Sequence, residues 1–134
     1  MIILTANGTA IELDDDLYWS DEYTWSPIQQ SIDWAADGAL MIDEFEKQAG
    51  RPITLQPPAP DAAWLPGVVL RQLQALAALP ELEMSLTVRS TTFAVMFRRN
   101  DGPAIEAEPV EFQSDPEPGD IGDQYLVTLR FIEI

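Results

Sequence analysis

The segment from Ser26 to Leu55 carries the most regular pattern in the chain and constrains the fold more than any other stretch. Its first part has the period of two that a β-strand requires, so one face is shared by Ile28, Gln30, Ile32 and Trp34. Asp37-Gly38 follows, and these residues tolerate the positive φ angles that a tight reversal demands. The segment therefore predicts a β-hairpin.

The second arm of this hairpin, Ala39 to Glu46, is rich in apolar residues, and Ile53–Leu55 resumes an extended run after the corner Gly50-Arg51-Pro52. Nothing in the stretch is catalytic. We interpret the hairpin and the strand after it as a scaffold that forms one half of a β-sandwich.

Apolar runs of strand length recur in the rest of the chain. Two of them flank Asn7-Gly8, a dipeptide typical of hairpin turns. The expected strands outside the organising hairpin are residues 2–5, 10–13, 84–89, 93–98, 105–112 and 124–134. Pro109 implies an edge position, and both faces of the last strand are largely apolar, which favours a strand covered on both sides.

One helix is expected, over about residues 65–79. Leu65, Val69, Leu73 and Leu76 repeat at helical spacing, and Pro80 ends the run. A single apolar stripe must cover a sheet face or the open end of a sandwich or barrel. The fold class is therefore mainly β, a β-sandwich or barrel with one flanking α-helix, in a single domain spanning residues 1–134.

The composition narrows the possible functions. The chain has neither cysteine nor histidine, which removes thiolate chemistry and the commonest general base and metal ligand near neutral pH. We therefore expect no enzyme and no cofactor. No apolar run reaches the roughly 18 residues that a membrane span needs, and the N-terminal stretch lacks the basic region of a secretory signal.

The charge balance is strongly acidic, with 23 acidic against 7 basic residues and a formal net charge of −16. Such a surface repels nucleic acid phosphates, so a conventional DNA- or RNA-binding domain is disfavoured. Two relations to nucleic acid remain, and both are compatible with the charge. The chain could form a wall past which DNA slides, or mimic DNA in the basic groove of another protein.

The acidic residues suggest two kinds of site, and neither is well supported. The loop at residues 115–123 offers oxygen ligands for Ca²⁺ or Mg²⁺, but it does not match the EF-hand pattern. Paired carboxylates could cleave a glycosidic bond, but nothing indicates which two would converge. We therefore predict no metal site and keep a carboxylate-dependent hydrolase as a third functional option.

Two groups of residues are candidates for contacts between subunits. The stretch Leu17–Ser26 is dense in aromatic residues, which either lie over the edge of the core or anchor a partner. The few basic residues pair either with acids of a neighbouring subunit or within the chain. The interface candidates are Tyr18, Trp19, Tyr23, Trp25, Arg51, Arg98 and Arg99.

The segment Leu17–Leu55 resembles small tail and baseplate proteins of long-tailed bacteriophages, particularly the distal tail protein group. The resemblance rests on Trp19-Ser20-Asp21-Glu22, on a strand, a glycine turn and a second strand, and on the corner Gly50-Arg51-Pro52. The order of strands, helix and strands also resembles the tail-tube fold, a β-sandwich flanked by a helix. Many distal tail proteins carry an additional C-terminal domain, for which this chain has no room.

The resemblance implies a structural protein of a virion tail, made in the bacterial host cytoplasm. It would form a homo-oligomeric ring, hexameric in that group, that contacts other tail proteins and lets DNA pass through an acidic channel. The candidates for lining the channel are Asp14, Asp15, Asp16, Asp115, Glu117, Asp120 and Asp123. Distal tail ring, tube component and another baseplate part all remain open, and the alternative is an acidic DNA mimic that inhibits a nucleic-acid-binding protein.

Overall fold

A computed structural model describes residues 1–134 and shows a mainly β protein with one α-helix. This confirms the fold class expected from the sequence. The strands before the helix are β1 (Ile2–Ala6), β2 (Thr9–Leu13), β3 (Tyr18–Trp19), β4 (Ile28–Trp34), β5 (Leu40–Glu46), β6 (Pro52–Gln56) and β7 (Trp64–Pro66). After them come α1 (Gly67–Ala77), β8 (Met84–Val88), β9 (Thr91–Phe97), β10 (Ile105–Pro109), the 3₁₀ turn η1 (Ile121–Asp123) and β11 (Gln124–Glu133).

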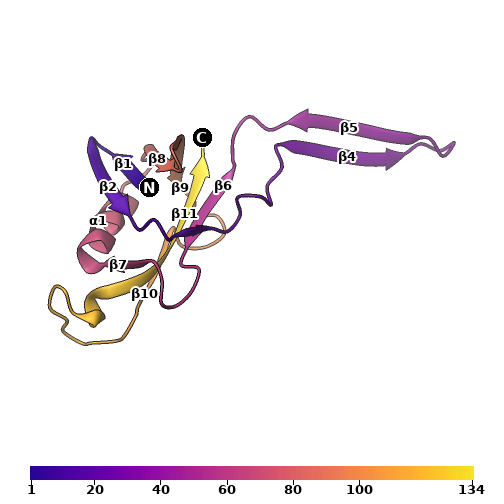
Figure 1. The fold of residues 1–134 in the computed structure, drawn as a ribbon. Coiled ribbons are helices and arrows are strands. Elements are labelled where there is room, and N and C mark those ends of the chain that lie inside the picture. Colours follow the sequence, from indigo (N-terminus) through magenta and orange to yellow (C-terminus); the bar gives the residue numbers. More distant parts are fainter.

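Nine of the strands form one antiparallel sheet, in the order β2-β1-β8-β9-β11-β6-β3, with β7 and β10 also paired to β11. The ten-residue β11 is its central strand, because its first half pairs with β7 and β10 and its second half with β6 and β9. Figure 1 shows β11 running through the middle of the body. Pro109 ends β10, whose only partner is β11, so it lies at an edge as the sequence predicts.

One face of the sheet encloses the core, a cluster of 22 buried hydrophobic residues. The alternation of β1, β8 and β11 points Leu4, Leu86 and Phe131 inward, and each of these side chains is fully buried. Leu70 and Leu73 of α1 join the same cluster. We call the opposite side of the sheet its outer face; no second sheet or helix covers it, so only one face of β11 is deeply buried, against the prediction of cover on both sides.

The helix begins later than the sequence predicts, because Leu65 and Pro66 belong to β7. Gly67 opens the helix at a point where the Asp123 carboxylate lies directly against its Cα, leaving no room for a Cβ atom. A glycine at this position therefore lets the helix pack closely against the start of β11.

Two-residue turns join β1 to β2 and β8 to β9. Asn7 and Gly8 have φ angles of 52° and 78°, which confirms the predicted turn between β1 and β2. Arg89 and Ser90, at 48° and 68°, make the turn between β8 and β9, so the first of these strands ends at Val88 and not at residue 89 as expected.

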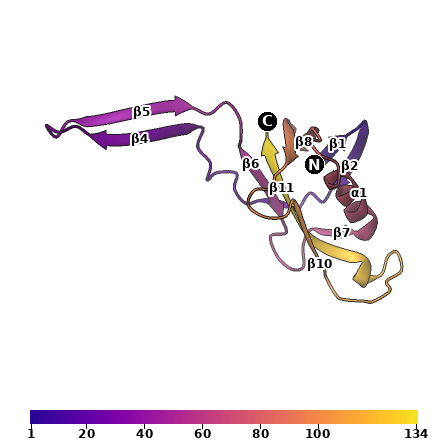
Figure 2. The same cartoon turned by 180° about the vertical axis from the view of Figure 1, so that it is seen from behind.

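The organising hairpin forms at the predicted residues but not in the predicted place. β4 and β5 pair only with each other, in a two-stranded sheet separate from the main one. Figures 1 and 2 both show this hairpin extending away from the body. It is therefore not half of a sandwich; only β6, the strand that follows it, belongs to the main sheet.

Candidate interaction surface

We use the term arm for β4, β5 and the turn between them, residues 28–46. Every residue of both strands is exposed. The antiparallel register places Ile32 opposite Ile42 and Trp34 opposite Leu40. Because residues directly opposite each other point to the same side of a two-stranded sheet, these four side chains share one face near the tip of the arm.

This apolar arm face consists of Ile32, Trp34, Leu40 and Ile42, whose exposed fractions are 53%, 70%, 48% and 50%. Closer to the body the same side becomes polar, where the Gln30 amide donates a hydrogen bond to the Glu44 carboxylate. The other side of the arm is mixed, because it carries Asp33 and Asp43 together with Met41 and Phe45. The arm thus has an apolar cluster near its tip that no other part of the chain covers.

Backbone hydrogen bonds hold the arm at both ends. At the tip, the Ala35 amide donates to the Ala39 carbonyl at 2.8 Å, and the Gly38 amide donates to the Ala35 carbonyl at 2.9 Å. At the base, the Lys47 amide donates to the Pro27 carbonyl at 2.7 Å. A lone two-stranded hairpin is only marginally stable in water, and exposed apolar patches are typical of interaction sites, so the arm is a candidate interaction surface.

The predicted aromatic interface segment divides between the surface and the core. Tyr18 and Tyr23 are 52% and 86% exposed, and Trp25 is half-buried with the Lys47 ammonium 5.4 Å from its ring centroid. Trp19 is 7% exposed and packs edge-on against Phe93, with the ring centroids 5.5 Å apart. Its side chain is therefore part of the core and not accessible to a partner in this structure.

The three candidate arginines all contact groups of their own chain, which is the intramolecular alternative left open by the sequence. The Arg51 guanidinium lies 4.7 Å from the Trp19 ring centroid and donates to the Glu22 carbonyl at 2.7 Å. Arg99 donates to the carbonyl of Ala77, the last residue of α1, at 2.6 Å. Its positive charge there complements the negative end of the helix dipole.

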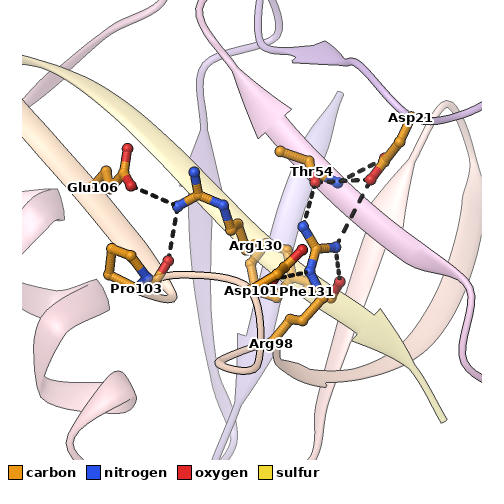
Figure 3. A network of polar contacts seen from close by, with 8 residues as sticks. All are labelled: Asp21, Thr54, Arg98, Asp101, Pro103, Glu106, Arg130 and Phe131. Carbon is orange, nitrogen blue, oxygen red and sulfur yellow. Dashed lines mark hydrogen bonds and ion pairs between the residues drawn. The ribbon is translucent and has the colours of Figure 1, made fainter.

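Arg98 is 8% exposed and lies in a polar network on the outer face of the sheet (Figure 3). Its guanidinium donates from Nη1 to the Phe131 carbonyl at 3.0 Å and from Nη2 to Thr54 Oγ1 at 2.8 Å. The Asp21 carboxylate accepts from both the Thr54 amide, at 3.0 Å, and the Thr54 hydroxyl, at 2.8 Å. The network joins β6, β11 and the segment after β3, so its role is to hold these strands together.

Arg130, which the sequence analysis did not single out, forms a second contact beside this network (Figure 3). Its Nη1 donates to the Pro103 carbonyl at 2.8 Å and lies 3.2 Å from the Glu106 carboxylate. The alternation of β11 places it on the outer face, and that pattern was the only sequence signal for its position.

The ionisation of Asp101 makes the stability contributed by the Arg98 network depend on pH. The hydrogen bond from Arg98 Nε to Asp101 Oδ1, 2.9 Å long, holds the pKa of Asp101 below its usual value of 3.8. A carboxyl whose pKa is lowered by folding stabilises the folded state above its unfolded pKa, and this contribution is lost as the pH falls through the folded value. We therefore expect Asp101→Asn to lose less stability than the unmodified chain between pH about 6 and about 3, measured by urea denaturation.

An equal slope in the two proteins over this pH range would contradict the assignment. Glu83→Gln is a suitable control, since it removes an exposed carboxyl that no hydrogen bond or ion pair engages.

The candidate channel-lining acids lie in two groups. In the first, between β2 and β3, Asp15 accepts a hydrogen bond from the Ile2 amide at 3.2 Å and Asp14 accepts one from the Asp16 amide at 2.8 Å. In the second, the loop before β11, Asp120 accepts from the Glu117 amide at 3.0 Å. Both views place this loop and the arm at opposite ends of the molecule (Figures 1 and 2).

Asp123 differs from the other acids of the loop, because it is buried and lies 4.0 Å from Arg71 Nη1. Asp115, Glu117 and Asp120 are exposed. No group of three acidic side chains in the chain is arranged to hold a metal ion.

A groove of about 850 Å³ lies between β10, β11 and the proline-rich connector at residues 57–60. It contains Glu106 and Glu108, which stand two residues apart on one strand and point to the same side. Glycoside hydrolysis uses carboxylates on either side of the scissile bond, so this pair does not have the required arrangement.

The fold and this surface define a single-helix β protein with a projecting arm that carries an exposed apolar cluster near its tip. A scan against models of known protein families found no match, and a search of curated proteins found none either. None of the helices is long and apolar enough to cross a membrane.

Proposed function

We propose that the chain is a structural protein of a phage or prophage tail, a distal tail or baseplate component that assembles with copies of itself into a ring around an acidic DNA channel. The observation that carries this proposal is the arm. An uncovered apolar face on a projecting hairpin is typical of an interaction surface, and in an assembly it would supply a contact to the next subunit.

The shape of the molecule supports a head-to-tail arrangement. The arm extends from one side of the body, so the surface it would contact on a neighbour differs from the arm itself. Contacts between two different surfaces generate closed rings or open filaments, depending on the rotation between neighbours. The net charge of −16 supports the channel, because an acidic wall does not adhere to DNA.

The acidic DNA mimic remains the second candidate, and the net charge favours it equally. The mimic hypothesis gives the apolar arm face no role, because a basic groove recognises spaced negative charges. That face offers none, since it consists of Ile32, Trp34, Leu40 and Ile42. We therefore prefer assembly.

The oligomeric state, measured by analytical ultracentrifugation over a range of concentrations and followed by electron microscopy, tests the proposal. Rings with a central hole are the expected result. A chain that stays monomeric at the highest soluble concentration, and instead binds a basic nucleic-acid-binding protein tightly, would overturn it.

We expect added salt to promote self-assembly. Each copy carries the same net charge of −16, so copies repel one another, and salt screens this repulsion while leaving apolar contacts intact. Sedimentation at about 0.05 M and about 0.5 M salt should show a larger assembled fraction at the higher value. Binding of a DNA mimic to a basic partner has the opposite salt dependence, so weakening of assembly by salt would contradict the prediction.

A further inference from the structure

A second surface of the molecule has the properties that the arm requires in a partner. It is the outer face of β2, β1, β8 and β9, which we call the uncharged face. Pairing across these strands places on it Ile3, Thr5, Ala10, Ser85, Thr87, Thr92, Ala94 and Met96, and Glu12 of the edge strand β2 is the only charged side chain that these four strands contribute. Small side chains dominate it, so it is flat, and nothing in the chain covers it.

The uncharged face carries fewer charged side chains than the part of the outer face around β10. Around β10 the same side of the sheet carries Glu106, Glu108 and Arg130. On the uncharged face the Thr87 and Thr92 hydroxyls are 3.1 Å apart and hydrogen-bond each other, which lowers the cost of removing water from them. In a chain with a net charge of −16, this is where a second copy meets the least repulsion.

The dimensions of the two surfaces agree. The apolar arm face spans three residues on each of two strands, roughly 10 Å by about 10 Å, while the four paired strands are about 19 Å across and at least five residues, roughly 17 Å, long. Two β-layers stack face to face when flat apolar surfaces meet. The arm of the same chain points away from the body, so it lies far from its own uncharged face in both views (Figures 1 and 2).

We propose that the apolar arm face of one copy docks on the uncharged face of the next copy. This inference rests on the proposed self-assembly and specifies which two surfaces form the contact. The opposite side of the arm, which carries Asp33 and Asp43 as well as Met41 and Phe45, stays in water. The area of one such contact, roughly 100 Å² per partner by these dimensions, is below that of a standard interface of about 800 Å² per partner. A single contact of this kind is therefore weak, and assembly through it should require a high protein concentration.

Two variants of the full chain test the contact without assuming how the arm is oriented. The arm variant carries Ile32→Ser and Trp34→Ser, and the face variant carries Thr5→Glu and Ala94→Glu. All four positions are exposed, so both variants should fold, which circular dichroism checks. Gln72→Glu with Ser114→Glu adds the same charge at exposed positions outside both surfaces and serves as the control.

In sedimentation at high salt and high concentration, we expect each variant alone to be monomeric and the control to assemble like the unmodified chain. An equimolar mixture of the two variants should form a dimer that does not grow, because one intact arm meets one intact uncharged face. A face variant that assembles normally, or a mixture that stays monomeric, would overturn the proposed contact. In that case, rings formed by the unmodified chain would still support self-assembly. An unmodified chain that never assembles would overturn both.

Discussion

Replacing Trp19 by alanine is expected to lower the free energy of unfolding by about 3–5 kcal/mol, the usual cost of truncating a large buried aromatic side chain. Trp19 is 7% exposed and contacts the Phe93 ring and the Arg51 guanidinium, so its removal leaves a cavity between β3 and β9. Domains of this size are stable by only about 5–15 kcal/mol, so the loss is a large part of the total. Urea denaturation followed by far-ultraviolet circular dichroism measures it.

Two further variants separate this role from a general effect of losing a tryptophan. Trp25→Ala removes a half-buried ring and its contact with Lys47, and we expect a loss of about 1 kcal/mol or less. Trp19→Phe keeps an aromatic ring and deletes an indole N–H that has no hydrogen-bond partner in the chain, so it should cost less than alanine. If Trp19→Ala leaves stability unchanged but prevents assembly, Trp19 is a contact residue after all.

The contrast between Trp19 and Trp34 shows what the sequence could and could not predict. The strands and turn around Asp37-Gly38 were predictable, because alternation and turn chemistry are local properties. The detachment of the arm was not, because a strand whose apolar face waits for a partner has the same alternation as a strand in a core. Aromatic density alone therefore favours an interface before the hairpin, where Trp19 is in fact buried, and gives no reason to prefer Trp34.

One signal in the sequence could have revealed the exposed arm. Gln30, Glu44 and Glu46 fall on the same side as the apolar tip residues. Burying that whole side in a sandwich would have removed two carboxylates from water without an ionic partner, which is costly. Polar residues interrupting an apolar face therefore argue for a surface that is covered only near its tip.

The partners of the arginines could not be predicted from a local sequence pattern, because they are set by tertiary structure. Arg98 and Arg99 are adjacent, so the sequence suggested one shared role. In the structure Arg98 bonds to Thr54, 44 residues away, and Arg99 bonds to the end of α1. Successive strand residues point to opposite faces, so neighbouring side chains at a strand end reach different partners.

Replacing Trp34 by alanine is expected to change stability little and to weaken assembly strongly. The side chain is 70% exposed on a hairpin that is separate from the main sheet and core, so the free energy of unfolding should stay within about 0.5 kcal/mol. Tryptophan is a frequent anchor of protein interfaces, and loss of an anchor costs about 2 kcal/mol or more per contact, roughly 30-fold in affinity. In a ring this loss recurs at every subunit contact, so the concentration needed for assembly should rise by at least that factor.

Phe112→Ala is the matched control for this variant. Phe112 is 78% exposed, and its loop lies at the opposite end of the molecule from the arm, so its removal should leave assembly unchanged. Equal weakening by both variants would show that assembly responds to total exposed apolar surface, as aggregation does, and would contradict a specific arm contact. Loss with Trp34→Ala alone, at unchanged stability, can arise only if the arm contributes to the contact between copies.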